Sequence, residues 1–177
     1  FDTGSEITDM ILENDNYALV VISNKLKYDK IETKKVIVKD TLFKMDTMKV
    51  LSGKDSVIKV TKNYGDIVNK TIERTEHKWN PAFVEKFTTK INALASEAKG
   101  GKVDFFMVTA PNDPSTIAEF SAAIAAKFNI FYADDIVLKT IMRSNPGVLL
   151  LKKGTIIEKW HINQVPDFAT IKKNYIK

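Results

Sequence analysis

The sequence predicts a mixed α/β fold with a β-rich insertion, and three observations support that prediction. Two apolar runs, Tyr17–Ser23 and Val103–Thr109, have the near-continuous β-branched and aromatic character of strands buried on both faces. Helical patterns with capping signals lie between and after these runs. Near the end of the chain, Leu149–Leu151 and Ile156–Trp160 flank Lys152-Lys153-Gly154, which predicts an antiparallel hairpin. A parallel pair and a late hairpin together predict a mixed central sheet in a three-layer arrangement.

The composition fits one domain, residues 1–177, with residues 24–79 as an insertion after the first core strand. The chain has 177 residues, of which 44% are hydrophobic, and no cysteine, which excludes disulfides, thiolate metal sites and thiol catalysis. Its net charge is +5, but the lysines are scattered among acidic residues, so we expect no nucleic-acid partner. The longest apolar runs are about five residues, far short of the roughly 20 that span a bilayer.

The first part of the chain predicts a short helix, a strand and the insertion. Thr8–Asn14 fits a helix with Thr8 as its N-cap and Asp9 in its first turn. After the Tyr17–Ser23 strand, residues 24–79 are polar and lysine-rich. Their apolar segments and a turn signal at Ser52–Asp55 predict a β-hairpin. Within it, Ile67, Val68 and Ile72 fit either a helical stripe or a strand.

Two further helices begin at an N-cap residue followed by proline, at Asn80-Pro81 and at Asp113-Pro114. Gly100-Gly101 ends the first of them. Apolar residues recur at helical spacing in both: Phe83, Phe87, Ile91, Leu94 and Ala98 in the first, and Ile117, Phe120, Ile124 and Phe128 in the second.

The last part of the chain predicts a short strand at Ile130–Tyr132 and two helices. Asp134 or Asp135 is expected to cap a helix through Met142. In that helix we expect Ile136 or Val137 to face inward together with Ile141 and Met142. Phe168, Ile171 and Tyr175 predict a closing helix.

At this point the chain resembles the thioredoxin-like superfamily, whose four-strand core is a βαβ unit followed by a ββα unit. Residues 8–23 are similar to its opening helix and central strand, and residues 144–160 to its cis-proline loop and terminal hairpin, with Gly154 at the turn. More narrowly, the stretches GSEITDM (4–10) and ADDIVLKTIMRSNPG (133–147), with Trp160, resemble the soluble C-terminal domain of certain DoxX-family membrane proteins. The resemblance covers residues 4–23 and 80–165 and leaves the insertion unexplained.

The resemblance implies a location and a partner. In such proteins a short bundle of membrane helices precedes this domain, which lies on the periplasmic face of the cytoplasmic membrane. The expected partner is therefore a protein, including the membrane part of the same full-length chain. The absence of an initiator methionine at Phe1 agrees with a processed or excised piece of a longer protein.

The resemblance also implies where the thioredoxin chemistry is missing. The redox motif of true thioredoxins would lie at about residues 24–30, where this chain has NKLKYDK. No side chain there is a thiolate nucleophile, so we expect no thiol-disulfide or peroxidase activity and no enzyme of that class. The candidate binding residues are Asn24 and Lys25 at that position and, in the proline loop, Arg143, Ser144, Asn145 and Pro146. The Asn145–Pro146 bond is expected to be cis, and a loop of this kind can pair with an extended peptide.

Other polar and aromatic residues have structural interpretations that we prefer. Arg143 fits a cation at a helix C-terminus as well as a carboxylate ligand. Adjacent Asp134 and Asp135 fit a cap and a dipole partner better than an acid/base pair or a metal site. His77 and His161 lack companions at ligand spacing, so no metal is expected, and no cofactor either. The tryptophans, Trp79 and Trp160, fit core or rim packing better than a ligand platform.

Three functional hypotheses remain from the sequence. The first is a non-catalytic domain that binds or scaffolds a partner. The second is an accessory subunit of an oxidoreductase whose redox centre lies on another chain. The third is a small-ligand binding domain that uses the loop face. The sequence alone does not choose among them.

Overall fold

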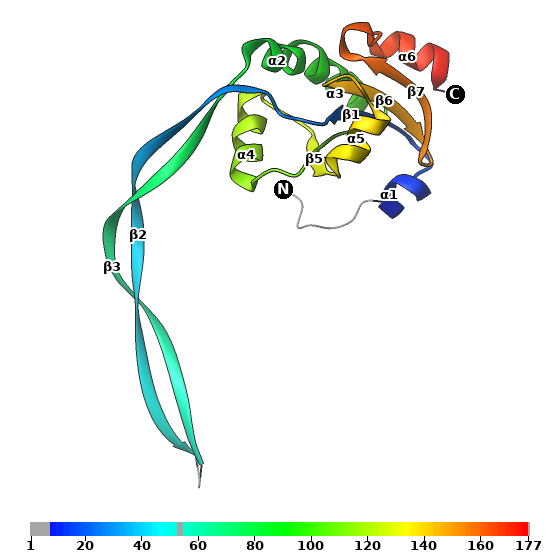
Figure 1. Cartoon of the computed structure of the whole chain (residues 1–177). Coiled ribbons are helices and arrows are strands. Elements are labelled where there is room, and N and C mark those ends of the chain that lie inside the picture. Colours follow the sequence, from blue (N-terminus) through cyan, green and yellow to red (C-terminus); the bar gives the residue numbers. More distant parts are fainter. Residues whose placement is uncertain (1–7, 53–54, 177) are drawn as a thin grey trace. The chain divides into compact units, whose positions relative to one another are not determined.

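The computed structural model describes residues 8–52 and 55–176, and the chain divides into two units (Figure 1). The core unit comprises residues 1–30 and 77–177, and the hairpin unit comprises residues 31–76. Each is described separately. Among the described residues, no helix combines the length and the apolar character needed to span a membrane.

The elements of the chain follow the predicted order. They are α1 (Thr8–Glu13), β1 (Tyr17–Ser23), β2 (Tyr28–Ser52), β3 (Asp55–Trp79), α2 (Pro81–Lys86), α3 (Asn92–Gly100), β4 (Asp104–Thr109), α4 (Pro114–Ala123), β5 (Asn129–Tyr132), α5 (Asp135–Ile141), β6 (Gly147–Lys152), β7 (Thr155–His161) and α6 (Phe168–Tyr175). A π-helical segment, Phe87–Ile91, joins α2 to α3, and a 3₁₀ turn, Ile162–Gln164, follows β7.

The core unit contains a five-stranded mixed sheet in the order β5-β4-β1-β6-β7. β1 pairs in parallel with β4, with Val20 opposite Phe106, and antiparallel with β6, with Val20 opposite Leu149. β5 adds a parallel edge to β4, and β7 an antiparallel edge to β6. The predicted mixed α/β class and the late hairpin are therefore confirmed.

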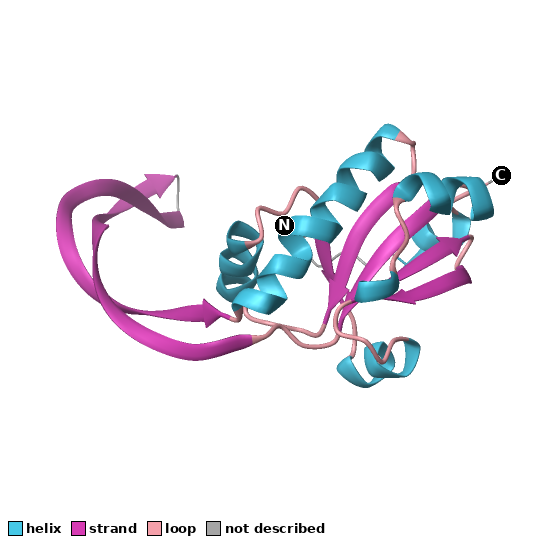
Figure 2. Ribbon diagram, turned by 90° about the horizontal axis from the view of Figure 1, so that it is seen from above, coloured by secondary structure: helices cyan, strands magenta, loops and turns pink. Residues whose placement is uncertain are grey.

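The two faces of the sheet bury different apolar clusters because successive strand residues point to opposite sides. On one face, Leu19, Val21, Met107 and Leu150 pack with residues of α2, α3, α4 and α6, including Phe83, Phe120 and Ile171. On the other face, Val20, Ile22, Phe106 and Leu149 pack with Leu138 and Met142 at α5 and with Ile11 of α1. Figure 2 shows helices on both sides of these strands.

Capping signals locate the helix starts. Asn80, Asp113 and Asp167 accept hydrogen bonds from backbone N–H groups three residues ahead. Pro81 and Pro114 occupy the first helical position, where the missing N–H costs nothing. The predicted caps at Asn80 and Asp113 are therefore confirmed, whereas the side chain of Thr8 lies outside the described residues.

Two details of the helices differ from the prediction. In α5, Ile136 and Val137 are 69% and 49% exposed, so the inward-facing role predicted for one of them is wrong. Leu138 takes that role, because it lies one turn before Met142 and both side chains are buried in the cluster on this face of the sheet. The predicted inward position of Met142 is confirmed, and Asp134 rather than Asp135 is the N-cap. The π-helical segment was also not predicted. It begins at Phe87, and the hydroxyls of Thr88 and Thr89 within it donate to the Glu85 carbonyl of the preceding turn, an alternative bonding that perturbs regular helices.

The β6–β7 turn forms where the sequence predicts it, but it has two residues rather than the predicted Lys152-Lys153-Gly154, because Lys152 still belongs to β6 and pairs with Thr155. Lys153 and Gly154 have φ values of 49° and 71°, as a type I′ turn requires. In the insertion, β2 ends at Ser52 and β3 begins at Asp55, so the predicted hairpin is confirmed, while Gly53 and Lys54 lie outside the described residues. Ile67, Val68 and Ile72 belong to strand β3, which settles their open assignment.

Candidate functional site

A polar cleft lies where the parallel strands of the core unit end. β1 ends at Ser23, β4 at Thr109 and β5 at Tyr132, and these residues close their paired ladders at one edge of the sheet. The segments that follow enclose a cleft of about 540 Å³, lined by Asn24, Lys25, Leu26, Tyr28, Ala110, Pro111, Asn112, Asp134, Asp135 and Lys139. Crevices at the carboxyl ends of strands are the usual ligand sites of open α/β sheets. The cleft is therefore our candidate site.

The proline loop is joined to the segment that follows β1. Asn145 Nδ2 donates to the carbonyl oxygen of Lys25 (2.7 Å), and Ser23 Oγ donates to Asn145 Oδ1 (2.7 Å). The Asn145–Pro146 peptide bond is cis, as expected from the sequence. The structure thus brings Lys25 and Asn145, which are far apart in sequence, into direct contact.

The remaining predicted site residues lie at different depths. Asn24 lines the cleft and is half-buried, whereas Pro146 is buried and therefore supports the loop rather than offering a surface. Arg143 is exposed two residues beyond α5 and is not among the residues that line the cleft. Of the six predicted residues, Asn24 and Lys25 line the cleft. Asn145 does not line it but is hydrogen-bonded to the backbone of Lys25.

Two hydroxyls near the loop lack a protein partner. Thr109 Oγ1, at the end of β4, and Ser144 Oγ are buried without a hydrogen bond to any described residue. An unsatisfied buried polar group costs about 1–3 kcal/mol, so such groups are usually satisfied by water or a ligand. At Gly147, an added Cβ would overlap Ser144 Oγ and the Met142 side chain, which explains the glycine at the start of β6.

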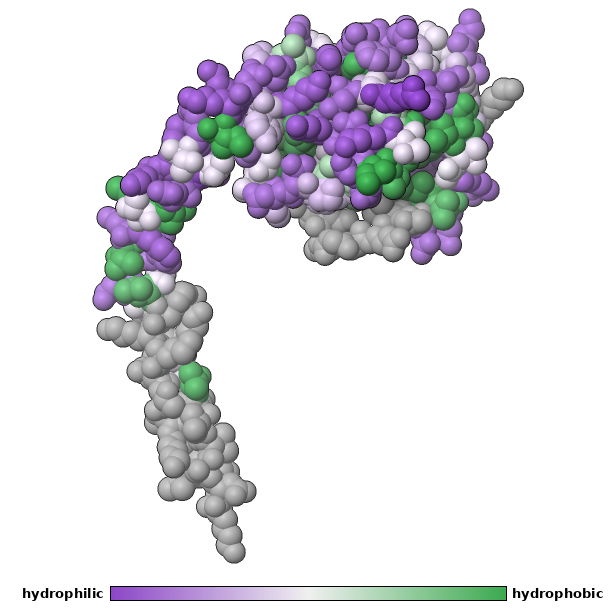
Figure 3. Space-filling model, in the orientation of Figure 1, coloured by the Kyte–Doolittle hydropathy of each residue, from purple (hydrophilic) through white to green (hydrophobic). Residues whose placement is uncertain are grey.

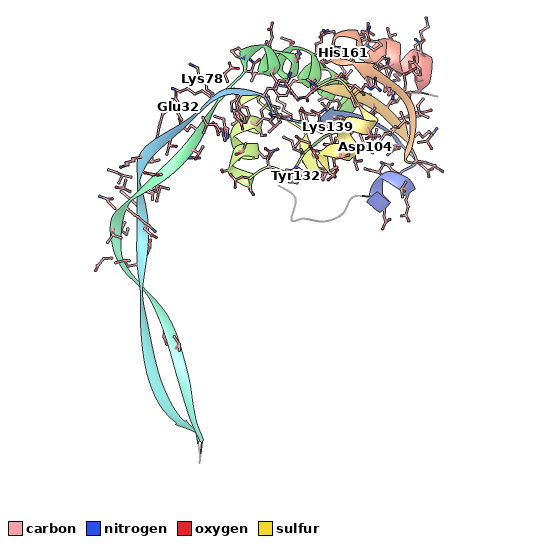
Figure 4. The ribbon with its side chains drawn as sticks, in the orientation of Figure 1. Glu32, Lys78, Asp104, Tyr132, Lys139 and His161 are labelled. Carbon is pink, nitrogen blue, oxygen red and sulfur yellow. The ribbon has the colours of Figure 1, made fainter. Side chains whose placement is uncertain are left out.

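Charges of both signs line the cleft at α5. Asp134 accepts from the backbone N–H groups of Ile136 (2.9 Å) and Val137 (3.2 Å), so its predicted capping role is confirmed. Lys139 Nζ lies 2.6 Å from Asp135 Oδ2. This hydrogen bond from Lys139 lowers the pKa of Asp135 below its ordinary value. Figure 4 labels Lys139 on α5 and Tyr132 on the adjacent β5. The described residues contain no group of three or more side chains suited to a metal ion.

An aromatic cluster borders the cleft through Tyr28. The Tyr28 ring meets His77 edge-on at 4.8 Å, His77 stacks on Trp79 at 5.3 Å, and Trp79 packs on Phe120 at 5.0 Å. Glu119 of α4 fixes His77 by accepting from its backbone N–H (2.7 Å) and by pairing with its Nδ1 (2.9 Å). His77 and Trp79 thus fasten the base of β3 to α4, which confirms the packing interpretation of Trp79.

The second histidine and the second tryptophan also have structural contacts. His161 Nδ1 accepts from the backbone N–H of Asn163 (3.1 Å) and so caps the 3₁₀ turn after β7. Trp160 meets Tyr175 edge-on at 5.6 Å, which attaches β7 to α6. The packing interpretation of Trp160 is confirmed as well.

An apolar groove of about 300 Å³ lies on the sheet face that packs against α5 and α1. Its lining includes Ile11, Ile22, Phe131, Val137 and Ile156. Among the residues that the structure describes, no charged side chain lines this groove, in contrast to the cleft. The groove therefore offers packing but few hydrogen bonds.

Comparison with known proteins gives no match. No protein-family model matches the chain, and no curated protein or solved structure matches it either. The site must therefore be interpreted from its geometry.

Sequence reasoning missed several residues that line the cleft, namely Tyr28, Asn112 and Lys139. A usable signal existed for Asn112, because polar residues that directly follow a buried parallel strand collect at one sheet edge. Tyr28 lies within residues 24–30, which the resemblance had already placed at the redox-motif position. Lys139 had no such signal, since only the folded chain brings α5 to the cleft.

Proposed function

We propose that the core unit is a non-catalytic thioredoxin-like domain that binds an extended segment of a protein partner at the polar cleft. We further propose that it is the periplasmic part of a DoxX-like membrane protein. The location rests on the resemblance of residues 4–10 and 133–147 to that family. The binding role rests on the geometry of the sheet and the cleft.

The order of the elements supports the thioredoxin-like arrangement. β1, the α2–α3 helix and parallel β4 form a βαβ unit, and β6, β7 and α6 form a ββα unit whose β6 lies antiparallel to β1. β5 is an additional parallel strand at the edge of the sheet. In sequence it lies between the βαβ unit and the ββα unit.

The observation that carries the proposal is the contact between the proline loop and the segment after β1. Asn145 bonds to Ser23 and Lys25, at the position where a thioredoxin has its cysteine pair. Without a thiol, residues 24–30 supply polar, charged and aromatic side chains together with the buried Leu26. Amide side chains at Asn24 and Asn112 and ions at Lys25 and Asp135 suit the peptide groups and charges of an extended segment.

Site-specific photocrosslinking in native membranes tests the binding role. A benzophenone amino acid replaces Asn112 in the cleft or, as a matched control, the exposed Lys172 on α6. We expect a discrete crosslinked partner from position 112 and none from position 172. The same pattern from both positions, or no product from position 112, would overturn the proposal.

Two companion observations separate the proposal from its alternatives. Four apolar segments of about 20 residues upstream in the full-length gene product would support the membrane attachment, and their absence would remove it. A crosslinked partner that contains a redox cofactor would favour the accessory-subunit hypothesis over a purely scaffolding role. Visible absorbance of the purified complex distinguishes these outcomes.

A further inference from the structure

The apolar groove lies on the face of the core sheet that carries α5 and α1. Residues of α2, α3, α4 and α6 pack on the other face, so among the described elements the groove face has the thinner cover. Both α5 and α1 contribute to the lining of the groove, whose volume is about 300 Å³. Figure 3 shows apolar residues gathered on the side of the core unit around α5 and α1. An apolar surface of this kind marks a site of interaction.

The groove is long and narrow. Its lining extends from Ile156 on the edge strand β7 to Tyr132 on the opposite edge strand β5. Neighbouring strands lie about 4.8 Å apart, so the two edges of the five-stranded sheet are roughly 19 Å apart. Distributed over that length, 300 Å³ corresponds to a cross-section on the order of 15 Å². An α-helix with side chains is about 10 Å in diameter, so the groove is too narrow for one.

The lining offers an extended peptide little to bond with. Among the described residues that line the groove, Tyr132 alone has a polar atom in its side chain. The floor consists of Val20, Ile22, Phe106 and Leu149, each of which is at most 5% exposed. A peptide would bring backbone N–H and C=O groups that need partners, whereas a hydrocarbon chain needs none. The shape and the chemistry of the groove therefore both favour a single hydrocarbon chain.

A small polar cavity adjoins the groove near the end of α1. It has a volume of about 20 Å³ and shares Ile11, Phe106 and Leu151 with the groove. That volume is enough for a group about the size of one water molecule. Its polar lining comprises Asn14, Asn16, Asp104 and Lys153. A ligand whose chain lies in the groove can therefore place a small polar head here.

The charges around this cavity favour a hydroxyl as the head. Asn14 Nδ2 donates to Asp104 Oδ2 (2.5 Å), and Lys153 Nζ pairs with Asp15 Oδ1 (2.5 Å). A carboxylate head would meet the Asp104 carboxylate, while the Lys153 ammonium already has an anionic partner. An ammonium head would meet Lys153. A hydroxyl is uncharged and can both donate to a carboxylate and accept from an amide.

We propose that the groove binds a dissolved, uncharged amphiphile that has one alkyl chain and a hydroxyl head, with the hydroxyl in the polar cavity. An apolar cavity of about 150 Å³ admits a benzene ring, so the groove holds a chain on the order of ten carbons. This site does not depend on the proposed role of the cleft. The groove and the cleft have no described lining residue in common.

Isothermal titration calorimetry of the whole chain at pH 7, with 1-decanol as the probe, tests the site. We expect one molecule of 1-decanol to bind per chain. Decanoate and decylammonium have the same alkyl chain but charged heads, and both should bind at least about tenfold more weakly. Methyl NMR locates the bound chain, because its protons should show intermolecular NOEs to the methyl groups of Val20 and Leu149.

Two matched double variants test the location independently. Val137 and Ile156 line the groove and are 49% and 45% exposed, so Val137→Glu/Ile156→Glu charges the groove without altering the core. This variant should weaken 1-decanol binding at least about tenfold. The control Ile136→Glu/Ile157→Glu alters the adjacent positions, which are 69% and 41% exposed and do not line the groove, and should bind like the wild-type chain.

Four results would overturn the proposal. They are no binding of 1-decanol, equal affinity for 1-decanol and decanoate, equal weakening in the two double variants, and binding that appears only after residues 1–7 are removed. The last result would assign the groove to that segment of the chain itself. Thermal unfolding followed by tryptophan fluorescence shows whether each variant remains folded.

Discussion

The core unit and the hairpin unit use similar strand-forming residues with opposite results. Strands β1, β4 and β6 bury Leu19, Met107 and Leu150 on one face and Val20, Phe106 and Leu149 on the other, because helices lie against both faces. Strands β2 and β3 leave Ile37 and Ile67 largely exposed. Strand propensity therefore determines where strands form, and a second layer determines whether they acquire a core.

The largest expected effect on the free energy of unfolding comes from truncating a buried side chain of the core unit. The same truncation in the hairpin unit should have little effect. Phe120 is fully buried and contacts the rings of Trp79, Phe83 and Phe87. Phe120→Ala should lower the free energy of unfolding by about 3–5 kcal/mol, because the lost contacts leave a cavity. Urea denaturation measures this as a lower midpoint at an unchanged slope.

The matched control for this comparison is Ile37→Ala in the hairpin. Ile37 is 70% exposed, so its truncation should change the free energy of unfolding of the core unit by less than about 0.5 kcal/mol. If both variants lowered the midpoint equally, the hairpin would share the core's cooperative unfolding, and the two-unit comparison would be wrong.

The sequence predicted the core unit well because its signals are local. The Tyr17–Ser23 strand, the caps at Asn80 and Asp113, and the turn at Gly154 each depend on a few neighbouring residues, and the structure confirms them. In α5 the inward position one turn before Met142 was assigned to the wrong residue, because Leu138 is buried there whereas Ile136 and Val137 are exposed.

The candidate site could be predicted only in part. The resemblance pointed to Asn24, Lys25 and Asn145, and the structure brings the last two into contact. The lining by Lys139 depends on packing between distant segments, which local patterns do not encode.

A smaller effect concerns acid stability of the core unit through the cap of α6. Asp167 Oδ1 accepts from the Thr170 backbone N–H (2.7 Å). Hydrogen bonds from the Thr170 backbone and side chain hold the pKa of Asp167 below its ordinary value. The carboxylate therefore contributes stability above the ordinary carboxyl pKa, and this contribution is lost as the pH falls through the lowered folded-state pKa.

The variant Asp167→Asn tests this, because asparagine still caps a helix but does not titrate. The melting temperature of the wild-type chain should fall relative to that of Asp167→Asn between about pH 5 and about pH 2. Asp167→Ala removes the cap and should be less stable than Asp167→Asn throughout. A wild-type melting temperature that keeps a constant offset from Asp167→Asn would contradict the prediction.

Removal of the hairpin unit has the smallest expected effect on the core unit. It tests the comparison between the two units most directly. Within the core unit, Asn80 N donates to Lys27 O (3.1 Å) and Tyr28 meets His77 edge-on, so the two chain segments already lie together.

Replacing residues 31–76 by an Asn-Gly turn should therefore close β2 and β3 as a short hairpin without disturbing the core. We expect the urea midpoint of the core to stay unchanged or to rise slightly, because a long connection costs closure entropy in the intact chain. A loss of more than about 1 kcal/mol would show that the hairpin stabilises the core directly.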